Sequence, residues 1–328
     1  MAMQMTIIGL GQIGASIGLA LSVHKKEIVR VGHDRQVETA RRAEKIGAVD
    51  KIALNLHRAV EDADIILLAI PVDEIRDVLQ LIAQDLKEEA VILDTSSCME
   101  TVSAWATAML PPKRFFVTLT PSLNPDHLFE TQRGIAAARA DLFQKSLMVI
   151  TCPPGTDQSA IKLAADLAAL LGAAPLFANA REFDGMTAAT RLLPCLCSAA
   201  LINATCNQPG WQEGRKLAGR AYAWGTQAVE DFDAAATPSQ SFLFNREHVL
   251  RVLDNLHTAL TELRDAVAAQ DASQLDDLLQ QALQQRRAWL NQRVSNDYGN
   301  LIPSPEMPRS GEALGRLLGI RPRQKEKK

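Results

Sequence analysis

A glycine-rich turn near the start of the chain is the first feature whose residue types and spacing point to chemistry. Residues 9–14 read GLGQIG, which fits the pattern G-x-G-x-x-G, and they overlap the end of the apolar run MTIIGL at 5–10. The turn opens a helical stretch, and a second apolar run ends in Asp34, twenty residues after Gly14. This order of strand, glycine turn, helix and acidic residue is typical of a dinucleotide-binding unit.

The three glycines have separate expected roles. Gly9 permits the tight turn, Gly11 lets the backbone approach a pyrophosphate, and Gly14 lets helix and strand pack closely. A glycine turn without any ligand is the structural alternative, and FAD is the alternative dinucleotide, although we find no second flavin signature.

The residues around these glycines refine the expected ligand. Gln12 and Ile13 begin the helix, whose N–H groups and partial positive charge favour phosphates. Asp34 is expected to accept hydrogen bonds from ribose hydroxyls and to repel a 2′-phosphate, which favours NAD over NADP. Arg35 follows immediately and could soften that choice by pairing with a phosphate.

Three other apolar runs end in segments that are candidates for a site. These are Ala69-Ile70-Pro71, Asp94-Thr95-Ser96-Ser97 and Thr120. Open α/β sheets bind ligands outside the carboxyl ends of their strands, so the first two segments are expected to line the nicotinamide side and Thr120 to face the cleft. Alternatively, Ser96 or Ser97 caps the helix that starts near Met99.

The elements that must position these residues alternate between strand and helix. Strands are predicted at 5–10, 28–34, 64–70, 90–96, 115–120, 146–152 and 174–178, with amphipathic helices such as 36–46 and 73–86 between most of them. This rhythm predicts an α/β fold, a Rossmann-type doubly wound, mostly parallel sheet over residues 1–178. Thr156 or Asp157 is expected to cap a helix after the turn at 152–157.

The second half of the chain has a different pattern. Residues 179–298 show helical periodicity without a convincing strand and predict an all-helical substrate and dimerisation domain. One helical segment, 274–293, carries a single stripe of leucines suited to a domain or dimer contact. Residues 299–328 are rich in Pro, Ser and basic side chains and predict a poorly ordered tail.

Bulk properties exclude several classes of protein. The net charge of −3 and the pI of about 6.1 give no basic field of the kind that nucleic-acid binders carry. Five cysteines, an odd number without paired metal-ligand spacing, predict reduced thiols in a cytoplasmic protein without a metal. Glycines interrupt the apolar N-terminus, and we expect neither export nor a membrane anchor.

These motifs together resemble the prephenate and arogenate dehydrogenase family over roughly residues 5–295. The carrying stretches are MTIIGLGQIGASIGLAL, VGHDRQVETARRAEKIGAVD, ADIILLAIPVDEI and AVILDTSSCM. The last stands where the family has Asp-Val-Gly-Ser-Val-Lys, so Asp94 and Ser97 align. In the helical half, FDGMTAAT and Leu193-Pro194 carry a weaker likeness.

The resemblance implies an oxidative decarboxylation in tyrosine biosynthesis, in which hydride leaves the ring carbon bearing the 4-hydroxyl as that hydroxyl loses its proton. The family uses a His from His-Pro-Met-Ala-Gly for this proton, and here Thr120 stands in that place. The family's lysine corresponds to Met99, its Ser-His-Leu-Pro-His run to 191–195, and the arginine that holds a substrate carboxylate falls near 222–224, where no arginine stands.

Substitutes for the lost groups can be named. Ser97, Thr120 and His127, which lies in a loop seven residues beyond Thr120, are the catalytic candidates. Arg191 could supply a positive charge, and Asn245 survives from the family's polar set, so both are candidates for substrate binding. Arg191 alternatively makes a surface salt bridge.

The sequence therefore predicts an NAD(P)-dependent oxidoreductase with a diverged substrate site. Its expected partners are NAD, with NADP second, a small carboxylated substrate, and a second copy of the chain in a homodimer through the helical domain. No nucleic acid or membrane is expected. Two alternatives stay open: an NAD-binding sensor without catalysis, and a dehydrogenase of another small carboxylic acid.

Overall fold

The computed structural model describes residues 2–232 and 238–296. The described residues divide into two compact units, one formed by 2–180 with 288–296 and the other by 181–232 with 238–287. The predicted domain limits at 178 and 298 stay a prediction, and the predicted tail at 299–328 lies outside the described residues.

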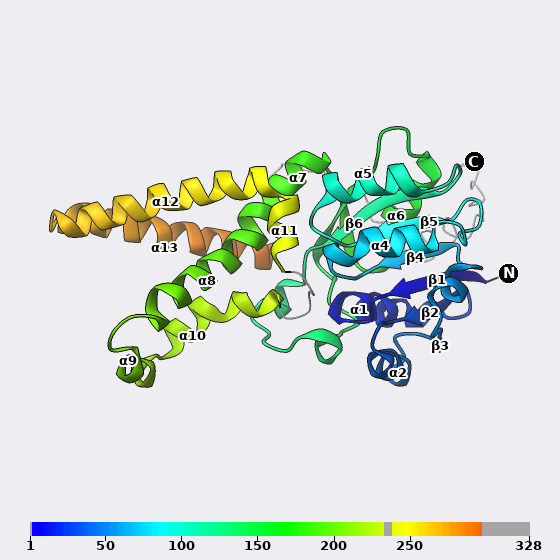
Figure 1. Cartoon of the computed structure of the whole chain (residues 1–328), viewed down its shortest axis with the longest axis horizontal. Coiled ribbons are helices and arrows are strands. Elements are labelled where there is room, and N and C mark those ends of the chain that lie inside the picture. Colours follow the sequence, from blue (N-terminus) through cyan, green and yellow to red (C-terminus); the bar gives the residue numbers. More distant parts are fainter. Residues whose placement is uncertain (1, 233–237, 297–328) are drawn as a thin grey trace, which may run out of the picture. The chain divides into compact units, whose positions relative to one another are not determined.

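The first unit is an eight-stranded sheet with helices on both faces (Figure 1). Its strands are β1 (Met3–Ile8), β2 (Ile28–His33), β3 (Lys51–Ile52), β4 (Ile65–Leu68), β5 (Val91–Asp94), β6 (Phe115–Pro121), β7 (Ser146–Thr151) and β8 (Ala173–Phe177). The spatial order is β3-β2-β1-β4-β5-β6-β7-β8, and every neighbouring pair is parallel except β6 and β7. The predicted α/β doubly wound fold is confirmed; the two-residue β3 was missed because it carries too few residues for a pattern.

Burial explains why these segments form strands. All four residues of β4 and of β5 are buried, as expected for strands covered on both faces. One apolar cluster joins β1, β5, β6 and β7 to the helices α1 (Gln12–Ala20), α2 (Val37–Lys45) and α6 (Gln158–Leu170). Three further helices follow one another along the chain: α3 (Leu56–Val60), α4 (Val72–Ile82) and α5 (Met99–Met109). Helix α4 packs against both α3 and α5.

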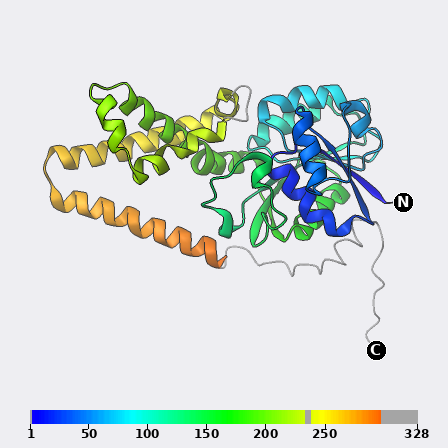
Figure 2. The ribbon, with the colours of Figure 1, turned by 90° about the horizontal axis from the view of Figure 1, so that it is seen from below.

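The second unit is helical, as predicted. Its helices are α7 (Ala180–Thr187), α8 (Leu193–Cys206), α9 (Trp211–Leu217), α10 (Arg220–Thr226), α11 (Ser239–Phe244), α12 (Arg246–Ala268) and α13 (Ala272–Ser295), the last of which runs into the first unit beyond Arg287. A π-helical turn, Ala188–Leu192, joins α7 to α8. Figure 2 shows α12 and α13 as two long consecutive helices joined by a short turn.

Candidate dinucleotide and substrate site

The glycine-rich turn connects β1 to α1 and is fixed by close backbone packing. Gly9 has φ +89°, in the region that favours glycine, and a Cβ there would lie 2.3 Å from the carbonyl oxygen of Ala69. A Cβ on Gly14 would lie 2.0 Å from the carbonyl oxygen of Gly9. The sequence predicts both roles, a tight turn and a close approach of helix and strand.

Gly11 differs from its two neighbours. It is the N-cap residue of α1, its φ of −69° suits any residue, and no heavy atom of the described residues other than Gly11 itself, Leu10 and Gln12 lies within 4 Å of the position of its Cβ. Packing inside the protein therefore does not require glycine here. The open space lies at the N-terminus of a nine-residue helix, where N–H groups favour an anion. This is the arrangement that a pyrophosphate needs.

Asp34 lies just beyond β2 and organises this turn. Its Oδ2 accepts a hydrogen bond from the Leu10 N–H at 2.8 Å, and its Oδ1 accepts one from the Gln36 N–H at 2.8 Å. Each carboxylate oxygen keeps a lone pair for a ribose hydroxyl.

Arg35 points to a different partner from the phosphate considered above. Its guanidinium forms a salt bridge with Glu74, in the first turn of α4. Burial raises the pKa of the Glu74 carboxyl; the Arg35 charge opposes this shift, and Asp73 and Asp34 add to it. The Glu74 carboxyl is thus close enough to Arg35, Asp73 and Asp34 for the charges of all three to affect its pKa.

A second polar group lies at the carboxyl ends of β5 and β6. The Ser96 hydroxyl donates to Asp94 Oδ2 at 2.6 Å, and the Ser96 N–H donates to Oδ1 at 3.1 Å. The Thr120 hydroxyl donates to the Ser96 carbonyl oxygen at 2.6 Å. Asp94 is fully buried, and this burial raises the pKa of its carboxyl to about 7 against the hydrogen bonds from Ser96 and Thr95.

The capping role considered for Ser96 or Ser97 is wrong. Cys98, and neither Ser96 nor Ser97, is the N-cap residue of α5, and it makes no side-chain capping bond. The Ser96 hydroxyl donates to Asp94 instead. The prediction for α6 is confirmed, since Asp157 is the N-cap and accepts from the Ser159 N–H at 2.7 Å.

The remaining predicted residues of the first unit lie at the same edge of the sheet. Ala69 and Ile70 pack on Gly9, and Pro71 is the N-cap residue of α4. The Thr95 hydroxyl donates to the Leu68 carbonyl oxygen at 3.1 Å. Ser97 is buried, with 7% of its surface exposed.

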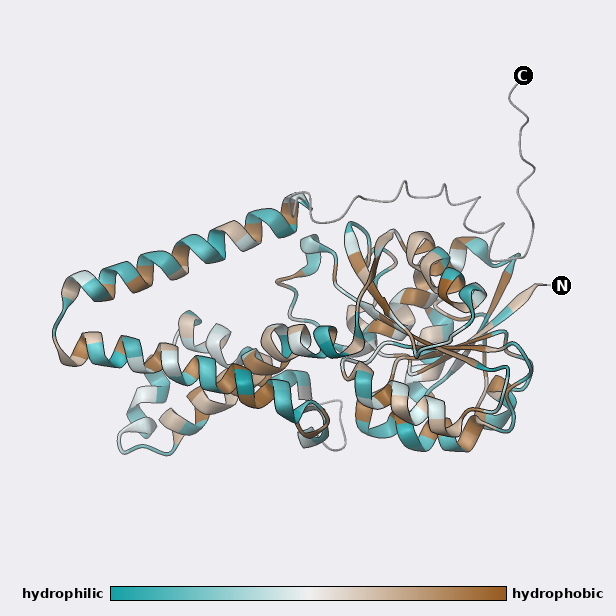
Figure 3. Ribbon diagram, turned by 90° about the horizontal axis from the view of Figure 1, so that it is seen from above, coloured by the Kyte–Doolittle hydropathy of each residue, from teal (hydrophilic) through white to brown (hydrophobic). Residues whose placement is uncertain are grey.

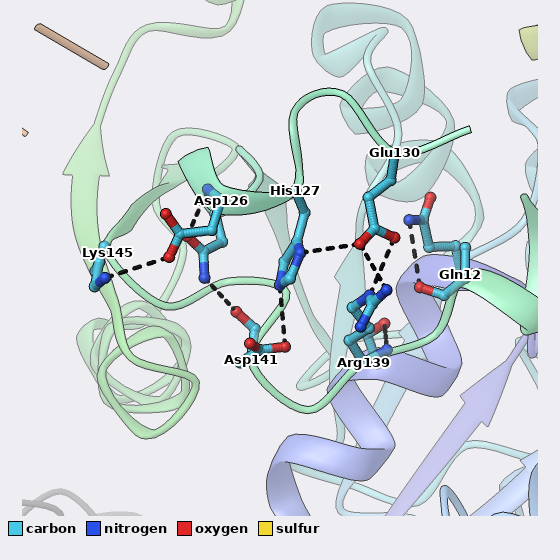
Figure 4. Close-up of polar contacts among 10 residues, drawn as sticks. Gln12, Asp126, His127, Glu130, Arg139, Asp141 and Lys145 are labelled. Carbon is cyan, nitrogen blue, oxygen red and sulfur yellow. Dashed lines mark hydrogen bonds and ion pairs between the residues drawn. The ribbon is translucent and has the colours of Figure 1, made fainter. Parts of the chain in front are cut away.

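His127 belongs to the loop between β6 and β7 (Figure 4). Its Nδ1 lies 3.3 Å from Glu130 Oε1, and its buried Nε2 lies 3.2 Å from Asp141 Oδ1, at an angle that does not make a hydrogen bond. Arg139 pairs with Glu130 at 2.6 Å. Both ring nitrogens of His127 therefore face carboxylates within the loop.

The same loop is anchored on α1 beside the glycine turn. The Gln12 side-chain amide donates to the Ala137 carbonyl oxygen at 3.5 Å, and the Arg139 N–H donates to the Ser16 hydroxyl at 2.9 Å. The predicted loop thus contacts the helix that begins the dinucleotide unit.

The two candidates in the second unit have different surroundings. Asn245 is buried, with 5% exposed, and its amide donates to the Asp184 carbonyl oxygen at 2.7 Å. Arg191 is exposed on the π-helical turn, a feature common at functional sites. A buried histidine, His248, lies with Arg251 beside Gly185. No sequence signal marks His248, because it lies in a helical pattern without a motif.

Other features bear on the classes considered above. All five cysteines are free thiols. Within 2–232 and 238–296, no group of three or more His, Cys, Asp or Glu side chains could hold a metal ion.

The helical stretch Ala180–Cys206 is long and apolar enough to cross a membrane, which is weak evidence because core helices of soluble proteins pass the same test. An open hollow of about 400 Å³ beside β3 contains none of the predicted site residues.

Fold and site together define a dinucleotide-binding oxidoreductase of the Rossmann type. Residues 17–176 match the family model described as the nucleotide-binding domain of prephenate dehydrogenase. The first unit is therefore similar to the nucleotide-binding domain of prephenate dehydrogenase, and the chain is a prephenate dehydrogenase-like oxidoreductase.

Individual relatives extend the likeness beyond the first unit. The chain is 27% identical to a cyclohexadienyl dehydrogenase of Zymomonas mobilis over 89% of this chain and 96% of the relative. It is 26% identical to a prephenate dehydrogenase of Bacillus subtilis over 82% of this chain and 71% of the relative. The crystal structure of an A. aeolicus prephenate dehydrogenase with hydroxyphenyl propionate and NAD+ superposes with a TM-score of 0.78 at 18% identity, covering 88% and 99% of the two chains, and supports the fold.

Proposed function

We propose that the chain is an NAD-dependent dehydrogenase that oxidatively decarboxylates prephenate or arogenate. The observation that carries the proposal is the open space at Gly11, between two glycines whose packing fixes the turn and in front of a helix N-terminus. A structural glycine turn has no use for this space, whereas a pyrophosphate fills it.

The residues at the turn fit the dinucleotide. The backbone at Gly11, Gln12 and Ile13 would hold the pyrophosphate, and the Asp34 carboxylate would accept hydrogen bonds from the adenosine ribose. Arg35 is held by Glu74, so it is less available to a 2′-phosphate, which supports NAD over NADP. NAD, when bound, supplies the acceptor for the hydride.

On the substrate side, we propose that Ser97 and Thr120 border the ring hydroxyl. The Thr120 proton is already donated to Ser96, so Thr120 can accept a hydrogen bond but is not a general base. We assign His127 to the loop and not to proton transfer, because both of its nitrogens face carboxylates. Arg191 and Asn245 stay proposed substrate-binding residues of the second unit.

The proposal is tested by NADH formation from purified protein with NAD and either prephenate or arogenate. We expect a rate with at least one substrate and its loss in Gly11→Val, whose bulk fills the open space. A wild type that binds NAD but forms no NADH would contradict the proposed reaction and favour a sensor or a dehydrogenase of another acid.

We further propose that two copies associate through the helical unit. None of the described residues of α13, 272–295, is buried, and Figure 3 shows hydrophilic and hydrophobic residues interspersed along it. Leu279, Val267 and Leu260 are each more than half exposed on α12 and α13. Light scattering should give a dimer, and a monomer that is fully active would contradict the association. The cytoplasmic location stays a prediction.

A further inference from the structure

Two departures from the family pattern touch one another at the carboxyl ends of β5 and β6. Thr120 stands where the family resemblance places the proton-accepting histidine, and Ser96 stands where it places the glycine of Asp-Val-Gly-Ser-Val-Lys. The Thr120 hydroxyl donates to the Ser96 carbonyl oxygen at 2.6 Å. Thr120, which stands in the place of the histidine, therefore holds the backbone of Ser96, whose hydroxyl has no counterpart in the glycine of the family pattern.

The new hydroxyl is joined to a carboxyl group. Ser96 Oγ lies 2.6 Å from Asp94 Oδ2 and donates to it, while the Ser96 N–H donates to Oδ1. A serine hydroxyl has one proton and two acceptor lone pairs, so one that donates to a carboxylate can accept a further hydrogen bond from outside. Ser96 keeps 8% of its surface exposed, whereas Asp94 keeps none.

We propose that Ser96 and Asp94 form a proton relay that replaces the family's histidine, with Ser96 contacting the substrate hydroxyl and Asp94 accepting the proton through Ser96. This inference rests on the proposed function and adds the group that takes the proton. Ser96 is then the catalytic residue that touches the substrate, and Asp94 acts through it.

The step is balanced within the proposed reaction. As hydride leaves the ring carbon with its electron pair for the nicotinamide, the hydroxyl proton passes to Ser96 Oγ and the Ser96 proton passes to Asp94. The carbon–oxygen bond becomes a carbonyl. When the ring carboxylate departs as CO2, its bonding pair enters the ring, and the oxygen takes the proton back through Ser96. No external acid or base is consumed.

Burial, and not a charged neighbour, is the main influence on the pKa of the Asp94 carboxyl. The neighbouring strands β4 and β6 carry no titratable side chain. On the helices that follow β4 and β5, the titratable side chains are Asp73, Glu74, Arg76, Asp77 and Glu100, and Cys98 precedes α5. Burial sets the pKa near 7, so the carboxylate form that the relay needs becomes populated as the pH rises through neutrality.

The test compares Ser96→Ala, Ser96→Thr and Asp94→Asn with the wild type in steady-state NADH formation from pH 5.5 to 9, a range chosen to bracket the titration at about 7. Ser103→Ala is the matched control, since the Ser103 hydroxyl on α5 is buried without a hydrogen-bond partner in the described structure. Infrared difference spectra of the full chain without substrate follow the protonated carboxyl of Asp94 independently of activity.

We expect Ser96→Ala and Asp94→Asn to lower kcat by roughly 10²–10⁴-fold with little change in KM, while Ser96→Thr and Ser103→Ala retain most of the rate. The rise of the wild-type rate through neutrality should vanish in Asp94→Asn, together with the infrared signal. An active wild type whose Ser96→Ala variant keeps its rate and pH profile would overturn the relay alone. A wild type that forms no NADH would overturn the proposed function as well.

Discussion

At β1, the backbone itself forms the site. A Cβ on Gly9 or Gly14 would clash with a backbone oxygen, whereas the space beside Gly11, at the N-terminus of α1, is open. At β5 and β6, on the same edge of the same sheet, the working parts are polar side chains: the Ser96 hydroxyl donates to the Asp94 carboxyl, and the Thr120 hydroxyl donates to the Ser96 backbone carbonyl. Packing of the first kind tolerates almost no change, whereas a hydrogen-bonded group can be rebuilt by exchanging a few side chains. The dinucleotide-binding turn is therefore expected to accept substitutions less readily than the polar group beside it.

The largest expected effect separates Gly14 from Gly11. Gly14→Ala places a methyl group 2.0 Å from a backbone oxygen, so we expect a loss of about 3 kcal/mol or more in the free energy of unfolding. Gly11→Ala should leave the melting temperature nearly unchanged and weaken NAD by at least about tenfold. Thermal unfolding and calorimetric titration with NAD check the pair. Equal losses of stability in both variants would show that Gly11 also serves packing.

Asp94→Asn should stabilise the protein at high pH. Burial raises the pKa of Asp94 from 3.8 in the unfolded chain to about 7 in the folded protein, so the free energy of unfolding falls as pH rises between these values. Removing the carboxyl should raise the free energy of unfolding at pH 8 by up to about 4 kcal/mol, since one pKa unit corresponds to about 1.4 kcal/mol. Denaturant unfolding at pH 8 and pH 4 measures this, with little difference expected at pH 4. A variant destabilised at pH 8 would mean that the carboxylate form holds the β5 segment together.

A smaller effect is expected at the ribose end of the dinucleotide site. Glu74→Gln removes one negative charge beside Arg35 and Asp34, so the ratio of NADP to NAD affinity should rise by about tenfold. Glu38→Gln is the control, because Glu38 pairs with Arg41 on the exposed surface of α2. Binding titrations with both dinucleotides check the ratio. Wild-type protein that already prefers NADP would refute our account of Asp34.

The smallest effect concerns His127. His127→Gln removes two contacts with carboxylates inside the loop, so the free energy of unfolding should fall by about 1 kcal/mol. The rate of NADH formation should fall by less than about tenfold, against the ~10²–10⁴-fold loss expected for a general base. Denaturant unfolding and initial rates at saturating substrate measure the two. A loss of ~10²–10⁴-fold in the rate would contradict this assignment and show that His127 acts as the general base.

The sequence predicts the backbone part of this site well and the side-chain part poorly. Gly9 and Gly14 obey steric rules that act within a few residues, so their spacing alone predicts the turn. The N-cap of α5 is Cys98 and not the predicted Ser96 or Ser97, because the exact first residue of a helix depends on tertiary contacts, such as the bond from Ser96 to the Asp94 carboxyl, that local pattern does not contain. The salt bridge of Arg35 with Glu74 joins residues from different elements, and only the folded sheet brings them together.

Hydride transfer itself tests the central claim most directly. The substrate, prephenate or arogenate, carries deuterium on the ring carbon that bears the hydroxyl. It is incubated with the protein and NAD, and the mass of the NADH formed is measured by mass spectrometry. Our account predicts NADH that contains the deuterium, formed at a rate that falls in Ser96→Ala. Unlabelled NADH, or no NADH from either substrate while NAD still binds, would contradict it.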